Sequence, residues 1–180
     1  MNRAVLIVWV SAVTLSLGAC EQSETDAASK NGVTAAPLTA ATLGEQTILS
    51  SKDYLTEGVY ASADTSRGEA LSTQCRACHS LEESGGTIVG PNLFGVFGRT
   101  AGSAPDYAYS EALSASGFVW TPRALDAWLA EPFAFLPGNR MSFPGLSEPK
   151  DRNGLIAYLL QYTDSGIQAG AADSVTESRD

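Results

Sequence analysis

The pentapeptide Cys75-Arg76-Ala77-Cys78-His79 decides what this chain can fold around. Two cysteines three positions apart project from one turn of helix, so their thiols can reach both vinyl groups along one edge of a haem. The histidine that follows is then placed under the iron, where its imidazole can ligate the metal. The motif therefore predicts one haem c, attached through Cys75 and Cys78, with His79 as an axial ligand of the iron.

Three other chemistries use a pair of cysteines at this spacing. A thioredoxin-like redox pair follows a strand, whereas residues 64–74 have the pattern of a short helix. A tetrahedral zinc site needs four ligands, and two Cys with the single His leave no obvious fourth. A structural disulfide between Cys75 and Cys78 would suit an oxidising compartment, but it does not account for His79.

A second axial ligand of the iron has few candidates. His79 is the single His of the chain, and Met141 is the only Met left once a signal peptide with Met1 is removed. A thioether is a soft ligand that favours ferrous iron. A Met is more often a core side chain, but the Pro- and Gly-rich segment 137–145 is typical of an irregular loop that presents a side chain. We therefore expect Met141 as the sixth ligand.

The N-terminus predicts export and a lipid anchor. An apolar run over residues 4–17 has the length of a signal-peptide core and is short for a membrane span. The residues Leu17-Gly18-Ala19-Cys20 resemble the bacterial lipoprotein box, which implies cleavage before Cys20 and lipidation of its thiol. An ordinary signal peptide and an uncleaved helical anchor are the alternatives, and both would also export the protein. Glu21 leaves the choice between inner and outer membrane open.

Composition divides the chain into four segments. From Glu21 to about Ser50 there is no aromatic residue and no sustained apolar period, which is typical of a flexible tether. Scattered apolar residues over 48–61 favour an arm that lies along the domain. The expected segments are a signal peptide at 1–19, the lipidated Cys with its tether and arm at 20–61, a folded domain at 62–165 and a disordered tail at 166–180.

From about Asp64 to Thr163 the chain resembles class I cytochrome c, of the mitochondrial and alphaproteobacterial type. The resemblance implies an all-α fold with about four to five helices around one covalently attached haem. Apolar spacing and the helix-starting Pro122 predict helices near 65–74, 109–115, 122–131 and 151–162. Besides the haem motif, the shared residues are Gly90-Pro91-Asn92-Leu93, Gly95, Phe97-Gly98-Arg99, Tyr109-Ser110, Trp120, Glu131-Pro132, Pro137-Gly138, Met141, Phe143 and Arg152 with residues 155–159.

The resemblance also implies roles around the haem. The Pro91 carbonyl is expected to accept a hydrogen bond from the His79 ring. A carboxylate in a pocket of low dielectric constant needs a cation and hydrogen-bond donors, and the residues implied for a buried propionate are Arg99, Tyr109 and Trp120. Trp128 stands where the family usually has a Tyr near the Met sulfur. The expected haem-lining residues are Leu93, Phe94, Leu125, Trp128, Leu129, Phe143 and Leu159.

One family feature is missing. Mitochondrial members ring the exposed haem edge with lysines, and this chain carries other residues at the matching positions, which are Gln74, Glu83, Gly86, Ile88, Phe133 and Ala134. Arg76 and Arg140 remain as the main positive charges on that face. With 11 Lys and Arg against 20 Asp and Glu, the chain has a formal charge of −9, which argues against nucleic acid as a partner. Docking is therefore expected to be short-range and partly apolar.

Together these features predict a single-electron carrier rather than an enzyme, with no catalytic residue and no small-molecule substrate. We expect a monomer, lipid-anchored on the periplasmic side of a bacterial membrane. Its partners would be redox proteins such as a respiratory reductase, an oxidase or a dehydrogenase. One alternative is a fixed cytochrome subunit of a membrane complex, with Phe133, Phe135 and Leu136 as an interface. The other is a haem peroxidase or gas sensor with an open sixth site.

Overall fold

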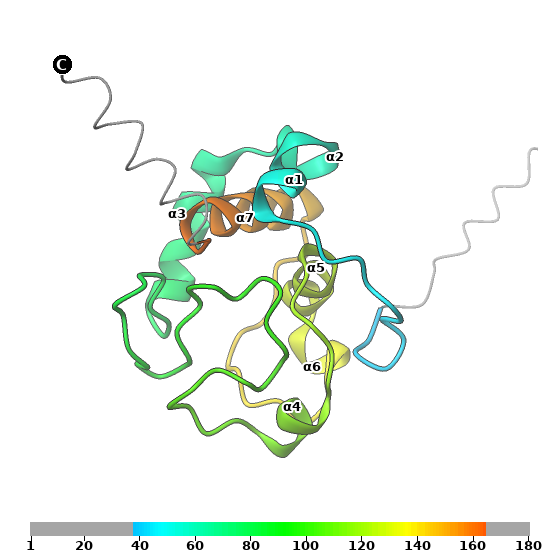
Figure 1. Ribbon diagram of the computed structural model, residues 1–180, viewed down its shortest axis with the longest axis vertical. Coiled ribbons are helices and arrows are strands. Elements are labelled where there is room, and N and C mark those ends of the chain that lie inside the picture. Colours follow the sequence, from blue (N-terminus) through cyan, green and yellow to red (C-terminus); the bar gives the residue numbers. More distant parts are fainter. Residues whose placement is uncertain (1–37, 165–180) are drawn as a thin grey trace, which may run out of the picture. The chain divides into compact units, whose positions relative to one another are not determined.

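The structure, a computed structural model, describes residues 38–164, and every regular element in that range is a helix (Figure 1). The all-α class expected from the sequence is therefore confirmed. Within this range the only β pairing is an isolated antiparallel bridge between Thr100 and Val119. The helices are α1 (Ser51–Thr56), α2 (Gly58–Ala61), α3 (Thr65–Arg76), α4 (Glu111–Ala115), α5 (Pro122–Ala130), α6 (Pro132–Phe135) and α7 (Pro149–Tyr162).

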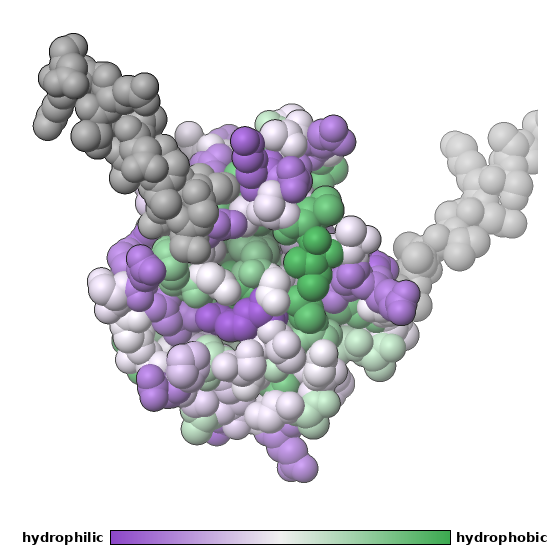
Figure 2. All heavy atoms as spheres, in the orientation of Figure 1, coloured by the Kyte–Doolittle hydropathy of each residue, from purple (hydrophilic) through white to green (hydrophobic). Residues whose placement is uncertain are grey.

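Some expectations fall outside this range or stop at its surface. The signal peptide, Cys20 and the C-terminal tail lie outside the described residues. No helix between residues 38 and 164 is both long and apolar enough to cross a membrane. On the face shown in Figure 2, apolar side chains form a narrow band among hydrophilic ones.

The four expected helices are present, and local caps set where they begin. Asp64 caps α3 by accepting a hydrogen bond from the Arg67 N–H at 2.9 Å, and Thr121 caps α5 in the same way. The last helix begins two residues earlier than expected because Pro149 occupies its first turn, where a missing N–H costs nothing. The short helices α1, α2 and α6 were not anticipated, since four to six residues carry too little periodicity.

Helices α3 and α7 cross at two glycines, and this contact brings the ends of the domain together (Figure 1). A Cβ on Gly68 would lie 2.0 Å from the Gly154 carbonyl oxygen, and one on Gly154 would lie 2.6 Å from the Asp64 carbonyl oxygen. Backbone therefore meets backbone at the crossing. The close approach fixes the direction of α3, which ends in the Cys pair.

Four aromatic rings form a closed circuit below the crossing. Phe118 contacts Trp120 and Phe135, and Trp128 contacts the same two rings, with centroid separations from 4.7 to 6.0 Å and edge-to-face geometry throughout. Edge-to-face pairs gain electrostatic energy beyond the area that they bury. Figure 1 shows that the circuit spans the helices α5 and α6 and the segment that precedes them. We call these four residues the aromatic circuit.

A buried guanidinium ties α7 to α5 and to the segment before α7. The Arg152 Nε donates to the Asp126 carboxylate at 2.7 Å. Its Nη1 donates to the carbonyl oxygens of Leu146 and Ser147 at 2.8 and 2.9 Å. Because a buried charge needs a partner and filled hydrogen bonds, this arrangement explains why an Arg is tolerated on the inner face of α7.

Residues 38–50 correct the expectation of a tether that stays flexible as far as Ser50. Leu43 is only 2% exposed and belongs to the core. The Ala40 N–H donates to the Phe135 carbonyl at 2.9 Å, and Arg123 donates to the Leu43 carbonyl at 2.9 Å. Low hydrophobicity over this stretch hid two well-spaced leucines that find sites on the domain. We call residues 38–50 the arm; α1 and α2 then continue it along α7.

The glycine crossing generates a stability prediction. We expect Gly68→Ala to destabilise the haem-loaded protein by about 1–3 kcal/mol through overpacking against the Gly154 carbonyl. That net loss should appear even though Ala is favoured over Gly by about 1 kcal/mol inside a helix. Gly86→Ala is the control, because a Cβ there meets no atom within 4 Å. Denaturant unfolding of both variants tests this, and equal midpoints would contradict it.

Candidate functional site

The two haem-motif cysteines lie at the end of α3. Cys75 is in the last turn, and Cys78 and His79 follow, with the His79 N–H donating to the Cys75 carbonyl at 2.8 Å. Both thiols are free and partly buried. Burial raises the pKa of Cys75 to about 11, so this sulfur is a neutral thiol at pH 7. The sequence motif therefore folds into one helix end with two adjacent uncharged thiols.

The His79 ring is oriented by the segment that follows the motif. Its Nδ1 lies 2.7 Å from the Pro91 carbonyl oxygen, the contact implied by the family resemblance. A Cβ on Gly90 would lie 2.3 Å from the ring, so the ring rests directly on backbone. Burial lowers the pKa of His79, and the Pro91 contact opposes it. A neutral ring that donates from Nδ1 to Pro91 leaves the Nε2 lone pair for a metal.

Asn92 holds the loop between His79 and Pro91 in shape, a role that the sequence analysis did not assign. Its amide nitrogen donates to the carbonyl oxygens of Glu82, at 2.9 Å, and Gly85. Its Oδ1 accepts from the Phe94 N–H at 2.8 Å. An Asn inside a Gly- and Pro-containing segment is a signal for such bonding, because its side chain competes well for backbone groups.

Met141 sits in a loop that a second asparagine holds. The buried Asn139 donates to the carbonyl oxygens of Pro132 and Leu136, both at 2.9 Å. Its Oδ1 accepts from the Met141 N–H at 3.0 Å. The loop expected from Pro and Gly content is thus irregular but well bonded. Asn139 was missed because a single polar residue in a loop carries no periodic signal.

The residues implied for a propionate lie close together. The Trp120 N–H donates to the Arg99 carbonyl at 2.9 Å. The Arg99 guanidinium donates to the carbonyls of Asn92 and Phe94. Burial lowers the pKa of Arg99, and the charge interaction with Tyr109 opposes this shift. Burial likewise raises the pKa of Tyr109, and Arg99 opposes that. A half-buried cation beside a phenol is suited to an anion.

The apolar candidates share one core with the ligand candidates. Trp128 is buried in the aromatic circuit, and Phe143, Met141 and Cys75 all pack against the same hydrophobic cluster. Leu129 and Leu159 are fully part of that cluster, while Leu93 and Leu125 border it. The contacts of Trp128 and Phe143 with a haem stay predictions.

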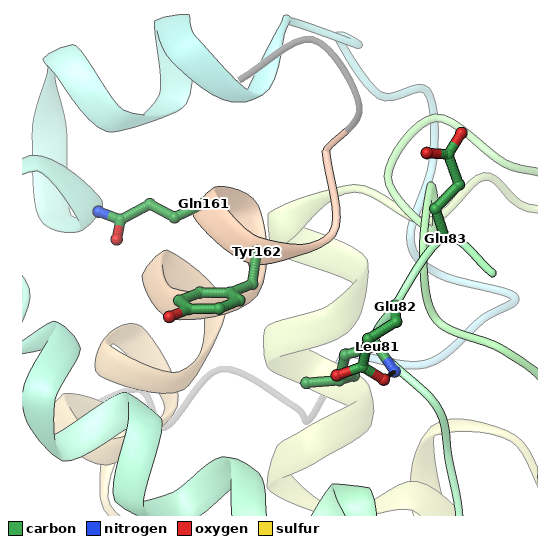
Figure 3. A pocket seen from close by; sticks show the side chains of 5 residues that line it. All are labelled: Leu81, Glu82, Glu83, Gln161 and Tyr162. Carbon is green, nitrogen blue, oxygen red and sulfur yellow. Dashed lines mark hydrogen bonds between the residues drawn. The ribbon is translucent and has the colours of Figure 1, made fainter. Parts of the chain in front are cut away.

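A pocket of about 380 Å³ lies next to this region (Figure 3). Figure 3 shows its lining, which comes from the segment after His79 and from the last turn of α7, namely Leu81, Glu82, Glu83, Gln161 and Tyr162. The Glu82 carboxylate is already bonded to Arg76 and Ser80. None of these five residues is among the candidate ligands.

The donor set fits a haem c. Two adjacent thiols suit thioether links, a neutral imidazole with an oriented ring suits one axial position, and a thioether on a bonded loop suits the other. Between residues 38 and 164 no group of three or more His, Cys, Asp or Glu side chains is gathered as a metal site. The attachment and ligation roles stay predictions, but each candidate residue has the environment that its role needs.

Comparison with known proteins places this arrangement in a family. No protein-family model matches the chain. It is 45% identical over 100 residues to a cytochrome c2 of Agrobacterium tumefaciens, covering 54% of this chain and 90% of that protein. A cytochrome c of Chlamydomonas reinhardtii is 45% identical over 101 residues, 56% of this chain and 90% of that protein. A cytochrome c2 of Afifella marina is 38% identical over 112 residues, with shares of 61% and 90%.

These relatives are matched over nine tenths of their length, and their likeness agrees with the thiol pair, the oriented imidazole and the helical fold. The chain therefore belongs to the class I c-type cytochrome family, and it is an electron carrier, not an enzyme, with one covalently attached haem c.

Proposed function

We propose that this cytochrome carries single electrons between membrane-bound redox proteins on a haem ligated by His79 and Met141. The observation that carries the proposal is the orientation of His79, whose Nδ1 is bonded to Pro91 at 2.7 Å and whose Nε2 is left for the iron. The bonded Met141 loop supports the second ligand. With both axial positions filled, the iron would have no site for a substrate.

When bound, the haem supplies the ferrous and ferric states that store one electron. The chain's part is to keep both ligands in place in either state. His79 is held by a carbonyl and by the backbone of Gly90, and the Met141 loop is held by Asn139. These contacts are made to the protein's own backbone, so they are the same whichever charge the iron has. A small structural change on electron transfer follows, which favours fast exchange.

Absorption spectra test this ligand set. We expect the oxidised wild-type protein to be low-spin, with the weak far-red band of a methionine–iron bond, and the reduced protein not to respond to carbon monoxide. Met141→Leu should lose the band and gain carbon monoxide binding, because Leu cannot coordinate iron. Ser142→Ala is the matched control and should behave as wild type. A wild-type protein that binds carbon monoxide would favour the peroxidase or gas-sensor alternative.

The expected docking face carries little free positive charge. The Arg76 guanidinium lies 2.6 Å from the Glu82 carboxylate and also donates to the Tyr158 hydroxyl. Arg76 and Ser80 hold the pKa of Glu82 down at about 2, so the carboxylate stays charged at neutral pH. Arg140 donates to the Ala108 carbonyl. The two arginines that were expected to attract partners are thus engaged within the protein.

Exposed apolar side chains replace the lysines of the family at this face. Ile88 is 59% exposed and Phe133 is 54% exposed, both at positions where the family has lysine. The neighbouring Val89 is 68% exposed. We therefore propose docking that is short-range and partly apolar. The wider apolar interface expected for a fixed subunit is corrected at Phe135, which is 1% exposed and belongs to the aromatic circuit.

Salt dependence tests the docking proposal. With a purified oxidase that has an acidic docking site as the probe, we expect the wild-type electron-transfer rate to be low. We also expect it to be nearly constant as the ionic strength rises from about 0.01 to 0.15 M, where the screening length falls from roughly 30 to 8 Å. Glu82→Gln should raise the rate at low salt and make it salt-dependent, because it frees the Arg76 charge. A steep fall of the wild-type rate with salt would contradict the proposal.

We also propose that Cys20 anchors the domain to the periplasmic face of a membrane by a lipid. The lipoprotein-like residues 17–20 support this proposal, as does the need of c-type cytochromes for haem attachment outside the cytoplasm. Because the arm already lies on the domain at Leu38, the tether would be residues 21–37. A random coil of that length has a root-mean-square reach of about 20–25 Å, enough for a domain to turn toward different membrane-bound partners.

Fractionation and mass spectrometry of the mature protein test the anchor. We expect wild type in the membrane fraction with a mature N-terminus at Cys20, and a mass increase that corresponds to acyl chains. Cys20→Ser should abolish lipidation and remove the protein from the membrane fraction. Glu21→Gln is the control and should remain anchored. A soluble wild-type protein would indicate an ordinary signal peptide, and a membrane-bound protein that retains residues 1–19 an uncleaved anchor.

A further inference from the structure

The arm lies beside the part of the domain that carries the implied propionate residues. Residues 98–101 and 118–120 run antiparallel and are joined by three backbone hydrogen bonds. These are Gly98 N–H to Trp120 oxygen at 2.9 Å, Trp120 N–H to Arg99 oxygen at 2.9 Å, and Ala101 N–H to Phe118 oxygen at 2.8 Å. We call these two segments the propionate ladder. Its strands place Arg99 and Trp120 next to each other.

One arm side chain bonds to both residues that flank Trp120. The Gln46 amide nitrogen donates to the Val119 carbonyl at 3.0 Å. The amide oxygen of Gln46 accepts from the Thr121 hydroxyl. That hydroxyl in turn accepts from the Ala124 N–H and so caps α5. Every polar atom of the Gln46 side chain and of the Thr121 cap is therefore used in a direction that the other atoms require.

A second contact reaches the other strand of the ladder. The methyl carbon Cγ2 of Ile48 would lie 3.8 Å from a Cβ on Gly98, the residue before Arg99. At its start the arm donates from the Ala40 N–H to Phe135, a member of the aromatic circuit that also contains Trp120. The arm thus touches the ladder on both strands and the aromatic circuit at its far side.

We propose that the arm is a strap for the haem propionate site and that Gln46 is its positioning residue. Gln46 holds the backbone on either side of Trp120, and the ladder transmits that hold to Arg99. The inference rests on the proposed function in one respect, since it takes Trp120 and Arg99 to face a propionate. It goes beyond that function because the strap lies outside the part of the chain that resembles the family.

A loosened strap would change the environment of the haem. If Trp120 and Arg99 moved apart, water would reach the propionate and the local polarity would rise. Solvent access and local polarity around an iron site control its potential, and a more polar site favours the ferric, more highly charged state. Loss of the Gln46 contacts should therefore lower the reduction potential, whereas loss of arm contacts elsewhere should not.

Two neutral, nearly isosteric substitutions separate these cases in the haem-loaded protein. Gln46→Met removes both hydrogen bonds to the Trp120 segment. Tyr54→Phe is the matched control, because the Tyr54 hydroxyl donates to the Thr47 carbonyl at 2.8 Å and accepts from the Leu49 N–H at 3.3 Å without touching the ladder. The measurements are the reduction potential and the hydrogen-exchange rates of the Gly98 and Trp120 amides.

We expect Gln46→Met to lower the potential and to speed exchange of both amides by about tenfold, the change expected for a loss of one to two hydrogen bonds. Tyr54→Phe should leave potential and ladder exchange as in wild type. Unchanged values for Gln46→Met, or equal changes in the two variants, would overturn the inference. In both cases wild type would keep its low-spin spectrum, whereas a wild type without that spectrum would overturn the proposed function itself.

Discussion

The close approach of α3 and α7 at Gly68 and Gly154 is the constraint from which the rest of the domain is built. Without side chains at the contact, the backbones meet, and the Cys pair at the end of α3 is held at a set distance from the core of α7. The buried face of α7 then provides the wall against which α5 packs. A bulkier crossing would displace the haem-attachment site together with its helix.

Outside the helices, the site is held by side chains bonded to backbone rather than by regular structure. Asn92 shapes the loop below His79, and Asn139 shapes the loop of Met141. Short loops of this kind can present a ring or a thioether at an angle that a helix or strand does not allow. Each asparagine fills donor and acceptor positions at once, which gives an irregular segment one stable shape.

The charge distribution follows a different logic from the overall charge. The chain is strongly acidic, yet Arg76 is neutralised locally by Glu82 and Arg152 is neutralised by Asp126. A protein arranged in this way has a weak directional field at the haem-motif end of α3. Long-range capture then contributes little to encounter, and local concentration from a membrane anchor would take its place.

Much of this protein is readable from sequence because the informative residues are few and locally patterned. The thiol spacing, the single His, the single mature Met and the apolar periods of α5 and α7 each follow from helix geometry or from scarcity. That was enough for the all-α class, the haem and the axial ligand candidates. The contacts that only the tertiary structure decided join residues far apart in the chain: Gln46 to Val119, Ala40 to Phe135, Asn139 to Pro132 and Arg76 to Tyr158. Such contacts depend on where helices cross and on which backbone groups are left to bond, and neither leaves a periodic trace in the sequence.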